Sequence, residues 1–452
     1  MAAPKTNLSA RGEVFAAPGS KVPMLDVVCD LWHPETNPGG YVSLGVAENT
    51  LMHTEIIEYM TKTFSIDSRS LTYGDGFSGS HRLRKTIARF INARFFPVTP
   101  VAKSHVLVTS GLGPAIELCG FSLCDKGDGV LLARPYYGSF PVDMGYRAEA
   151  QIIGVSFGTS DPMGLETVQA YEAALEEARC KGIRVRALLL CNPHNPLGRC
   201  YTRELLEAYM RFCQKHSLHL ISDEIYALSI WENPDAPDAP GFTSVLSIDT
   251  ADLIDPSLVH VLWGMSKDFG SNGIRLGCVV SQNNAPFLRS LESNSYFACP
   301  SALADLATSR ILSDDAFVET YTQTNRKRLA ENYTLTVRFL KDQKIPYEKG
   351  ANAGFFVWVD LFEPIREQVN TAVLNDLGLE SSETASRRLE AKLQEALLKN
   401  RIFLASGAAF GSDIPGWFRI VFAHDQDYLK LGLGRMVEAV ETFGRELGDA
   451  KK

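Results

Sequence analysis

The chain has 452 residues, of which 45% are hydrophobic and 22% charged, and this length is enough for two or three domains with large buried cores. Its formal net charge is −8 at pH 7, and no block of lysine and arginine interrupts the acidic balance. Because nucleic-acid binding depends on clustered positive charge, this composition argues against a nucleic-acid partner.

The cysteines and the first residues bear on the cellular environment. Nine cysteines are scattered without C-x-x-C spacing, which argues against a disulfide framework and against a metal site. The first residues lack the apolar core of a signal peptide, and no apolar run is long enough to span a membrane. We therefore expect a reducing compartment, the cytoplasm, and no membrane partner.

The first 40 residues or so are rich in proline, glycine and alanine. They predict an extended arm with a short amphipathic helix near residues 22–32, and a frayed terminus is the alternative. A short apolar strand then leads into Ala47, Glu48 and Asn49. Asn49 is predicted to cap the N-terminus of a helix over residues 51–64.

The next segment predicts a strand, a glycine-containing turn and a helix. The strand covers residues 106–108, and the helix begins near Pro114, with Leu112 and Gly113 in the turn between them. A helix N-terminus offers free N–H groups and a favourable dipole to a phosphate. The turn is therefore a candidate anion site.

Three more apolar strands end in residues that suit a binding site. One precedes Tyr137, a second over residues 185–191 precedes the turn NPHNPLG with Asn195, and a third ends at Asp223, three residues before Tyr226. The prolines of the turn bias the residues before them away from helix and so fix its geometry. In parallel sheets, binding sites open at the carboxyl ends of the strands.

The stretch from Leu258 to Gly277 organises the rest of the chain. Its apolar run, Leu258 to Trp263, predicts a buried strand of a parallel sheet, and Lys267 follows at the mouth of that strand. A lysine there is costly unless it is paired, exposed or used chemically. Arg275 follows in a glycine-containing loop that suits an anion. A surface lysine and a structural arginine are the alternative.

The C-terminal part predicts helices, a strand and a second candidate arginine, Arg419, within the sequence WFRIVFA. A planar guanidinium can bind a carboxylate through two parallel hydrogen bonds. The predicted elements are, in order, helices over 286–312 and 316–343, a strand over 351–361, a polar insertion over 363–386, and helices over 387–400 and 427–447.

Several of these motifs resemble those of one enzyme family. The pattern S-K-x-x-G-x-x-G-x-R-x-G, present as Ser266, Lys267, Gly270, Gly273, Arg275 and Gly277, resembles the lysine region of class I/II aminotransferases. These are fold-type I enzymes that depend on pyridoxal 5'-phosphate. The motif sequences are most similar to those of enzymes related to 1-aminocyclopropane-1-carboxylate (ACC) synthase, especially fungal ones. The resemblance runs from about residue 44 to about residue 425.

The resemblance implies a role for each candidate residue. It implies three catalytic residues: Lys267 carries the cofactor covalently, Asp223 pairs with the ring nitrogen, and Tyr226 donates a hydrogen bond to the ring oxygen O3′. The other residues implied to bind the cofactor are Leu112, Gly113, Tyr137 (with Tyr136 as the fallback), Asn195, Ser266 and Arg275. For the substrate it implies Glu48 and Arg419, the latter for the α-carboxylate, and it implies no metal.

The resemblance also implies a fold and an assembly. The fold is α/β, with a large domain over residues 70–315 that carries a mostly parallel seven-stranded sheet. Residues 1–69 form an arm and part of a small α+β domain, which residues 316–452 complete. Arms of this kind cross onto a second subunit in the family, so a homodimer is expected.

Two positions depart from the family pattern. Class I enzymes usually place a tyrosine that reaches the phosphate of the neighbouring subunit where Phe77 aligns, although Tyr73 lies four residues upstream. Gly264 aligns where relatives often have a serine. Phenylalanine and glycine side chains cannot donate hydrogen bonds to a phosphate. These departures argue against efficient ACC synthesis.

We expect an enzyme that acts at the α-carbon of an amino acid. The preferred prediction is an aminotransferase of fungal secondary metabolism. The alternatives are a lyase, either a C–S lyase or an ACC synthase acting on S-adenosylmethionine, since the machinery for forming a carbanion is shared and the rest of the pocket sets the product. A regulator that binds the cofactor without turnover is the non-enzyme alternative. The absence of a DNA-binding extension or basic segment disfavours it.

Overall fold

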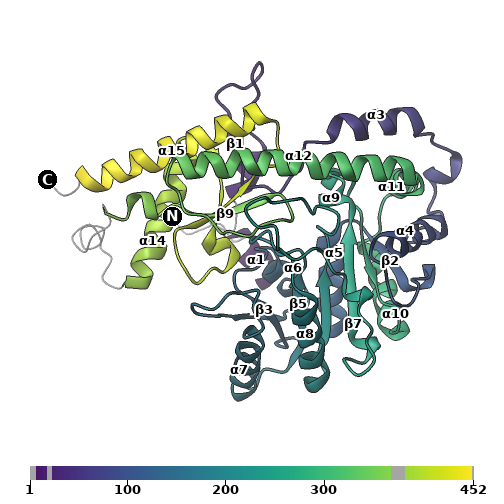
Figure 1. The fold of residues 1–452 in the computed structure, drawn as a ribbon. Coiled ribbons are helices and arrows are strands. Elements are labelled where there is room, and N and C mark those ends of the chain that lie inside the picture. Colours follow the sequence, from purple (N-terminus) through teal and green to yellow (C-terminus); the bar gives the residue numbers. More distant parts are fainter. Residues whose placement is uncertain (1–6, 18–22, 368–381, 450–452) are drawn as a thin grey trace.

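The computed structural model describes residues 7–17, 23–367 and 382–449 (Figure 1). Residues 1–6 and 18–22 of the predicted arm, and residues 368–381 of the predicted polar insertion, lie outside them. No helix within the described ranges is both long and apolar enough to cross a membrane.

A seven-stranded sheet forms the centre of the larger part of the molecule, as predicted. Only β8 runs antiparallel to its neighbours, β2 and β7. In spatial order the strands are β2 (Val106–Thr109), β8 (Gly277–Val280), β7 (Val259–Gly264), β6 (His219–Asp223), β5 (Val185–Cys191), β3 (Gly129–Ala133) and β4 (Gln151–Val155). Most of these strands are buried along their whole length, because helices cover the sheet, and so they read as short apolar runs.

Helices connect and cover these strands. α8 shows why they form where they do: Thr202 accepts a hydrogen bond from the N–H of Leu205 at its start, and Ser217 ends it in the left-handed conformation. Its apolar residues recur at helical spacing and are buried. The helices of this part are α4 (His81–Arg94), α5 (Leu112–Leu123), α6 (Phe140–Gly145), α7 (Thr167–Cys180), α8 (Arg203–His216), α9 (Met265–Asp268), α10 (Ala285–Asn294) and α11 (Ala302–Ser313).

The smaller part joins segments from both halves of the chain. Near its start, β1 (Val42–Ser43) pairs in parallel with β10 (Ile402–Phe403), and β9 (Phe356–Asp360), β12 (Trp417–Val421) and β11 (Ala405–Ser406) form an antiparallel sheet. In Figure 1, α12 runs along the top of the molecule past both parts. The remaining helices are α1 (Ala10–Ala16), α2 (Pro23–Val28), α3 (His53–Thr63), α12 (Asp315–Asp342), α14 (Ser382–Lys399) and α15 (Gln426–Asp449).

Two sequence predictions about helices are wrong. The helix predicted over residues 286–312 is two helices, because Pro300 interrupts the pattern and Ser301 caps α11 by accepting a hydrogen bond from Ala304 N at 3.1 Å. Asn49 does not occupy the N-cap position of α3, where Met52 lies. Instead Asn49 is fully buried, and its side-chain amide donates to Oδ1 of Asn325 on α12 at 2.9 Å.

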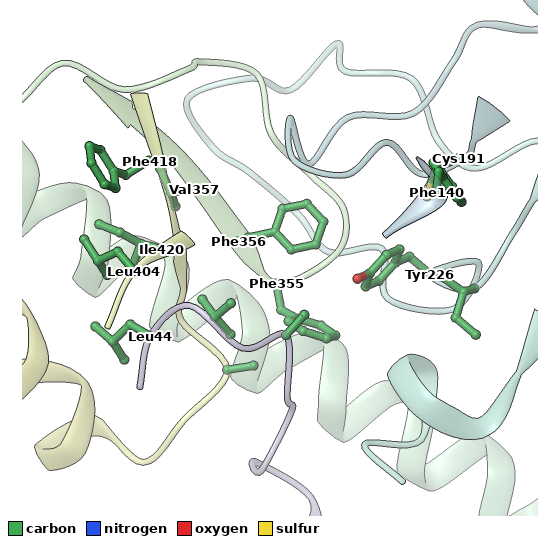
Figure 2. Packing of buried hydrophobic residues seen from close by; sticks show 14 of the residues in the cluster. Leu44, Phe140, Cys191, Tyr226, Phe355, Phe356, Val357, Leu404, Phe418 and Ile420 are labelled. Carbon is green, nitrogen blue, oxygen red and sulfur yellow. The ribbon is translucent and has the colours of Figure 1, made fainter. Parts of the chain in front are cut away.

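The two sheets share one hydrophobic core. Phe355 and Phe356 lie between the small sheet, where Phe418 and Ile420 pack, and Tyr226 of the larger part (Figure 2). The ring of Tyr226 lies 5.4 Å from that of Phe355 and 5.2 Å from that of Phe356, edge to face. This packing holds the small sheet against the carboxyl ends of the central strands.

Two histidines at the amino ends of β6 and β7, the half-buried His219 and the fully buried His260, give the fold a predicted pH dependence. The rings of His219 and His260 share a hydrogen bond of 2.9 Å, and His260 contacts the hydroxyl of Ser281 at 2.9 Å. Burial, followed by Arg186, lowers the pKa of His219 to about 4, and burial and His219 lower the pKa of His260 well below its usual value. Folding therefore disfavours protonation of both rings.

We expect the free energy of unfolding to fall as the pH drops from about 6.5 towards 4. Over that interval the histidines bind protons in the unfolded chain but not in the folded protein. Each titrating histidine therefore lowers the free energy of unfolding by up to about 1.4 kcal/mol per pH unit. Urea unfolding at pH 7 and pH 5 would measure the loss. His219→Gln should reduce the difference between the two pH values, whereas His81→Gln, at an exposed position, should not. An equal difference in wild type and His219→Gln would contradict the assignment.

Candidate active site

The carboxyl ends of β5, β6 and β7 bring three of the predicted residues to one edge of the central sheet. Cys191, the last residue of β5, is paired with Asp223, the last residue of β6. Asn195 follows β5 in the turn predicted from its prolines, and Lys267 follows β7 in α9. Arg419 reaches the same place from β12 of the small sheet, where it donates to Oδ1 of Asn195 at 2.9 Å.

Lys267 lies in the one-turn helix α9 with its side chain directed at the N-terminal segment. Its Nζ donates to the carbonyl oxygen of Ala47 at 2.6 Å. Burial and then the charge of Arg419 lower the pKa of Lys267 to about 8, against the opposing charges of Glu48 and Asp223. A larger fraction of this amine is therefore neutral near pH 7 than of an exposed lysine. A neutral amine can act as a nucleophile or as a base.

Asp223 is a buried carboxyl, 3% exposed, at the end of β6. Burial raises its pKa to about 7, and the nearby Asp143 contributes in the same direction. The N–H of Ile225, which donates to Oδ1 of Asp223 at 3.1 Å, and the charge of Lys267 both favour the ionised form. A cationic group placed beside this carboxyl would stabilise its ionised form and lower its pKa.

Arg419 is almost fully buried, with 4% of its surface exposed. One Nη atom donates to Asn195, and the other donates to the carbonyl oxygen of Gly45 at 2.6 Å. The rings of Phe410 and Phe356 lie 4.8 Å and 5.5 Å from the guanidinium carbon. The Nε atom is buried and has no hydrogen-bond partner. Since buried donors are normally satisfied, this atom indicates a place for an acceptor.

A cradle for a second anion lies at the N-terminus of α5. Gly111 has a φ of +105°, a conformation that residues other than glycine rarely adopt, and the guanidinium of Arg275 lies directly over it. Leu112 and Gly113 form the first turn of α5, which contains no acidic residue. The free N–H groups of this turn and the Arg275 side chain together suit a phosphate.

Two tyrosines and a serine complete the predicted set. Tyr137, after β3, lies edge to face with Phe140 at 5.2 Å, and Tyr226 is buried against the two phenylalanines of the shared core. Burial raises the pKa of both tyrosines, so both hydroxyls stay protonated at neutral pH. Ser266 is 7% exposed and precedes Lys267 in α9.

Several contacts in this region involve groups that the sequence motifs did not indicate. Glu48 was predicted, but its partner Asn272, which donates to Oε1 of Glu48 at 2.8 Å, was not. The carbonyl groups of Gly45 and Ala47 were not predicted either, and backbone acceptors leave no signal in a sequence. Asn272 could have been suspected, since it lies between the glycines of the lysine motif. Residues 45–49 therefore form one wall of the site.

Phe77 and Tyr73 belong to a cluster of aromatic side chains that includes none of the site residues described above. The ring of Phe77 contacts those of Tyr73 at 5.6 Å and Tyr296 at 4.9 Å, and Tyr73 is 83% exposed. Gly264 is held by close backbone contact: a Cβ there would lie 2.6 Å from the carbonyl oxygen of Leu276. A serine at position 264 would therefore require β7 and β8 to shift.

No group of three or more histidine, cysteine, aspartate or glutamate side chains that could hold a metal ion is found among the residues that the structure describes. Three charged groups of the site, Lys267, Arg275 and Arg419, suit organic anions, and the carboxyl of Asp223 suits a cationic partner.

Comparisons with known proteins agree with this arrangement. The family model for aminotransferase class I and II matches residues 40–436. The chain is 34% identical to the probable aminotransferase aclI of Aspergillus oryzae, with 90% of this chain and 91% of the relative covered. It is 32% identical to the probable inactive 1-aminocyclopropane-1-carboxylate synthase-like protein 2 of Mus musculus, with 90% and 67% covered.

Solved structures show the same fold. An aromatic aminotransferase from Pyrococcus horikoshii superimposes with a TM-score of 0.71 at 22% identity, covering 94% of this chain and all of that one. The aspartate aminotransferase of Thermus thermophilus with maleate gives a TM-score of 0.71 at 20% identity, covering 96% and 100%. From the match over residues 40–436 and these relatives, the chain belongs to the class I and II aminotransferase family.

Proposed function

We propose that this protein is a pyridoxal-phosphate-dependent enzyme that acts at the α-carbon of an amino acid, with transamination as its main reaction. The observation that carries the proposal is the convergence of three charged groups. Lys267 has its pKa lowered to about 8, and both Arg419 and Asp223 contribute to that value through their charges. A base, a carboxylate and a guanidinium are the groups needed to bind an amino acid and remove its α-proton.

The described residues fit the cofactor. The space that a Cβ at Gly111 would fill faces the Arg275 guanidinium, next to the free N–H groups of Leu112 and Gly113. These groups would hold the phosphate. Asp223 would face the ring nitrogen, where a carboxylate stabilises a positive charge. Asn195, Tyr226, Tyr137 and Ser266 would hold the remaining edges and faces of the ring and the phosphate.

The cofactor, when bound, supplies a conjugated ring that accepts the electron pair left on the α-carbon. The chain supplies the rest. Lys267 would carry the cofactor in the resting enzyme and, once released by the substrate amine, would take the α-proton on Nζ. Its lowered pKa favours the neutral amine that this step requires.

Arg419 would hold the substrate α-carboxylate. Its Nε is buried without a partner, while its Nη atoms are already fixed by Asn195 and Gly45. The guanidinium is therefore oriented before substrate arrives, which reduces the entropy lost on binding. Glu48, which accepts a hydrogen bond from Asn272, would contact the substrate side chain.

A surface group of aromatic side chains supports the homodimer. Tyr73, Tyr296 and Phe297 are 83%, 60% and 77% exposed, and their rings join through Phe77. Exposed aromatic groups of this kind mark protein interfaces. Sedimentation of the purified protein would measure the assembly.

The division into a large domain at residues 70–315 and a small domain from both flanking segments belongs to the same proposal. It is supported by the placement of all seven central strands between residues 106 and 280. A cytoplasmic location is supported by the nine cysteines, all of which are free.

The test is a product screen of the purified, cofactor-loaded protein by mass spectrometry. Common L-amino acids with a keto-acid acceptor, S-adenosylmethionine and cysteine conjugates would be supplied separately. Amino-group transfer to the acceptor supports the proposal. Side-chain loss from cysteine conjugates without transfer would make the enzyme a lyase. No change in cofactor absorbance with any amino acid would reject the proposal.

We expect slow or no release of ACC from S-adenosylmethionine. Phe77 cannot donate a hydrogen bond, and Gly264 cannot be replaced by serine without moving β8, so two neutral phosphate donors are missing. Each is worth about 0.5–1.5 kcal/mol, somewhat more to a charged acceptor. The pocket near the phosphate, at the boundary between the two proposed subunits, therefore differs from one shaped for a large sulfonium substrate. Steady release of ACC over many turnovers, at rates normal for enzymes, would contradict the expectation.

A further inference from the structure

Residues 407–416, the segment between β11 and β12, join the small sheet to the loop that carries Tyr137. The carbonyl oxygen of Phe410 accepts a hydrogen bond from Tyr136 N at 2.9 Å. The carbonyl oxygen of Gly411 accepts one from Arg134 Nη1 at 3.1 Å. A Cβ at Gly138 would lie 2.3 Å from the carbonyl oxygen of Ala409, so the two backbones are in direct contact.

A single buried carboxylate holds both ends of this segment. Glu390, on α14, is 1% exposed. Its Oε1 accepts from Ala408 N at 2.7 Å, and its Oε2 accepts from Gly416 N at 3.1 Å. Arg387, one turn earlier, lies 3.4 Å from Oε2 and donates to the carbonyl oxygen of Ser412. A carboxylate that accepts two backbone N–H groups and pairs with an arginine fixes the geometry of all three partners.

The middle of the segment reaches the candidate carboxylate site. Phe410 is 3% exposed, and its ring packs on that of Trp358 at 5.4 Å. On its other side the ring lies 4.8 Å from the guanidinium carbon of Arg419. The position of this ring limits how the guanidinium can tilt, and hence the direction in which its free N–H groups point.

We propose that Glu390 is a positioning residue for carboxylate recognition: through residues 407–416 it places Phe410 against Arg419 and holds the small sheet against the Tyr136 loop. The inference rests on the proposed function, because Arg419 is taken to bind the substrate carboxylate. It assigns a role in that site to a side chain on α14, which acts through its hydrogen bonds to the backbone of residues 408 and 416.

The test compares two aminooxy compounds that react with the aldehyde of the bound cofactor. Aminooxyacetate has a carboxylate for Arg419, and O-methylhydroxylamine has none. The ratio of their second-order rate constants, followed by cofactor absorbance, therefore measures carboxylate recognition alone. Glu390→Gln leaves one backbone N–H facing the amide nitrogen, which cannot accept a hydrogen bond, and should lower this ratio roughly tenfold while the O-methylhydroxylamine rate changes little. The exposed Glu395→Gln on the same helix should keep the wild-type ratio.

A second readout needs neither substrate nor cofactor. Hydrogen exchange at the amides of Ala408 and Gly416, which Glu390 binds, should be faster in Glu390→Gln than in Glu395→Gln. Wild-type protein that does not distinguish the two compounds would reject the proposed function. Wild-type discrimination that Glu390→Gln retains would overturn the inference about Glu390.

A second variant keeps the inference testable if Glu390→Gln does not fold. Phe410→Leu removes the ring and leaves the hydrogen bonds of Glu390 to the backbone of residues 408 and 416 in place, so it should lower the same ratio. Where both single variants fold, their losses should not add in the double variant, because both act on one guanidinium. An unchanged ratio in Phe410→Leu, or additive losses, would overturn the inference.

Discussion

Replacing Lys267 by alanine is expected to abolish turnover, with a loss of at least about 10³-fold, within the range attributed to a positioned acid–base group. No other amine lies in the described site at the carboxyl ends of the central strands, and Nζ of Lys267 is already fixed on the carbonyl of Ala47 at 2.6 Å. The fold should survive, because α9 is one turn long and the lysine side chain only partly buried. Steady-state rates with the donor found by the product screen would measure the loss.

The lysine that carries the cofactor can be identified separately from the rate. Borohydride reduction of the loaded wild-type protein should attach the cofactor to the peptide containing Lys267. The variant Lys267→Ala should incorporate none, while Lys327→Ala, at an exposed position on α12, should behave as wild type. Recovery of the label on a different lysine would show that the assignment is wrong.

Asp223→Asn should retain the cofactor and lose about 10²–10³-fold in rate, the range seen when one preorganised electrostatic group is removed. Asparagine can still accept from the N–H of Ile225, so the turn after β6 should keep its shape. It cannot stabilise a positive charge on the ring nitrogen, and the electron pair of the α-carbon then loses its acceptor. Absorbance titration would report cofactor binding, and single-turnover kinetics would report proton removal.

The neighbouring Asp143 provides a companion measurement with a defined sign. Its charge raises the pKa of Asp223, which burial places at about 7. Removing that charge in Asp143→Asn should lower the pKa of Asp223, so the acidic limb of the pH–rate profile should move to lower pH.

Near-wild-type turnover in Asp223→Asn would place the ring-nitrogen contact on another group.

The sequence by itself determined the elements and the chemical types of the site. The central strands are short apolar runs because both faces of a mostly parallel sheet are covered, and α12, at residues 315–342, lies within one residue at each end of the helix predicted over 316–343. Local spacing was also sufficient to place Lys267 just beyond β7 and Asp223 at the end of β6, since both follow directly from where an apolar run stops.

Contacts between distant segments were decided only by the tertiary structure. The partners of Lys267 and Arg419 are the carbonyl groups of Ala47 and Gly45, 220 and 374 residues away in the sequence. The amide group of Asn49, which looks like a local helix cap, donates across the core to Asn325, while its Oδ1 accepts locally from Leu51 N. A buried amide gains more from a partner in the core than from a cap position exposed to water, and no local pattern encodes that partner. For the same reason the sequence gives the identity of Arg419, whereas the fold sets the direction of its free donor.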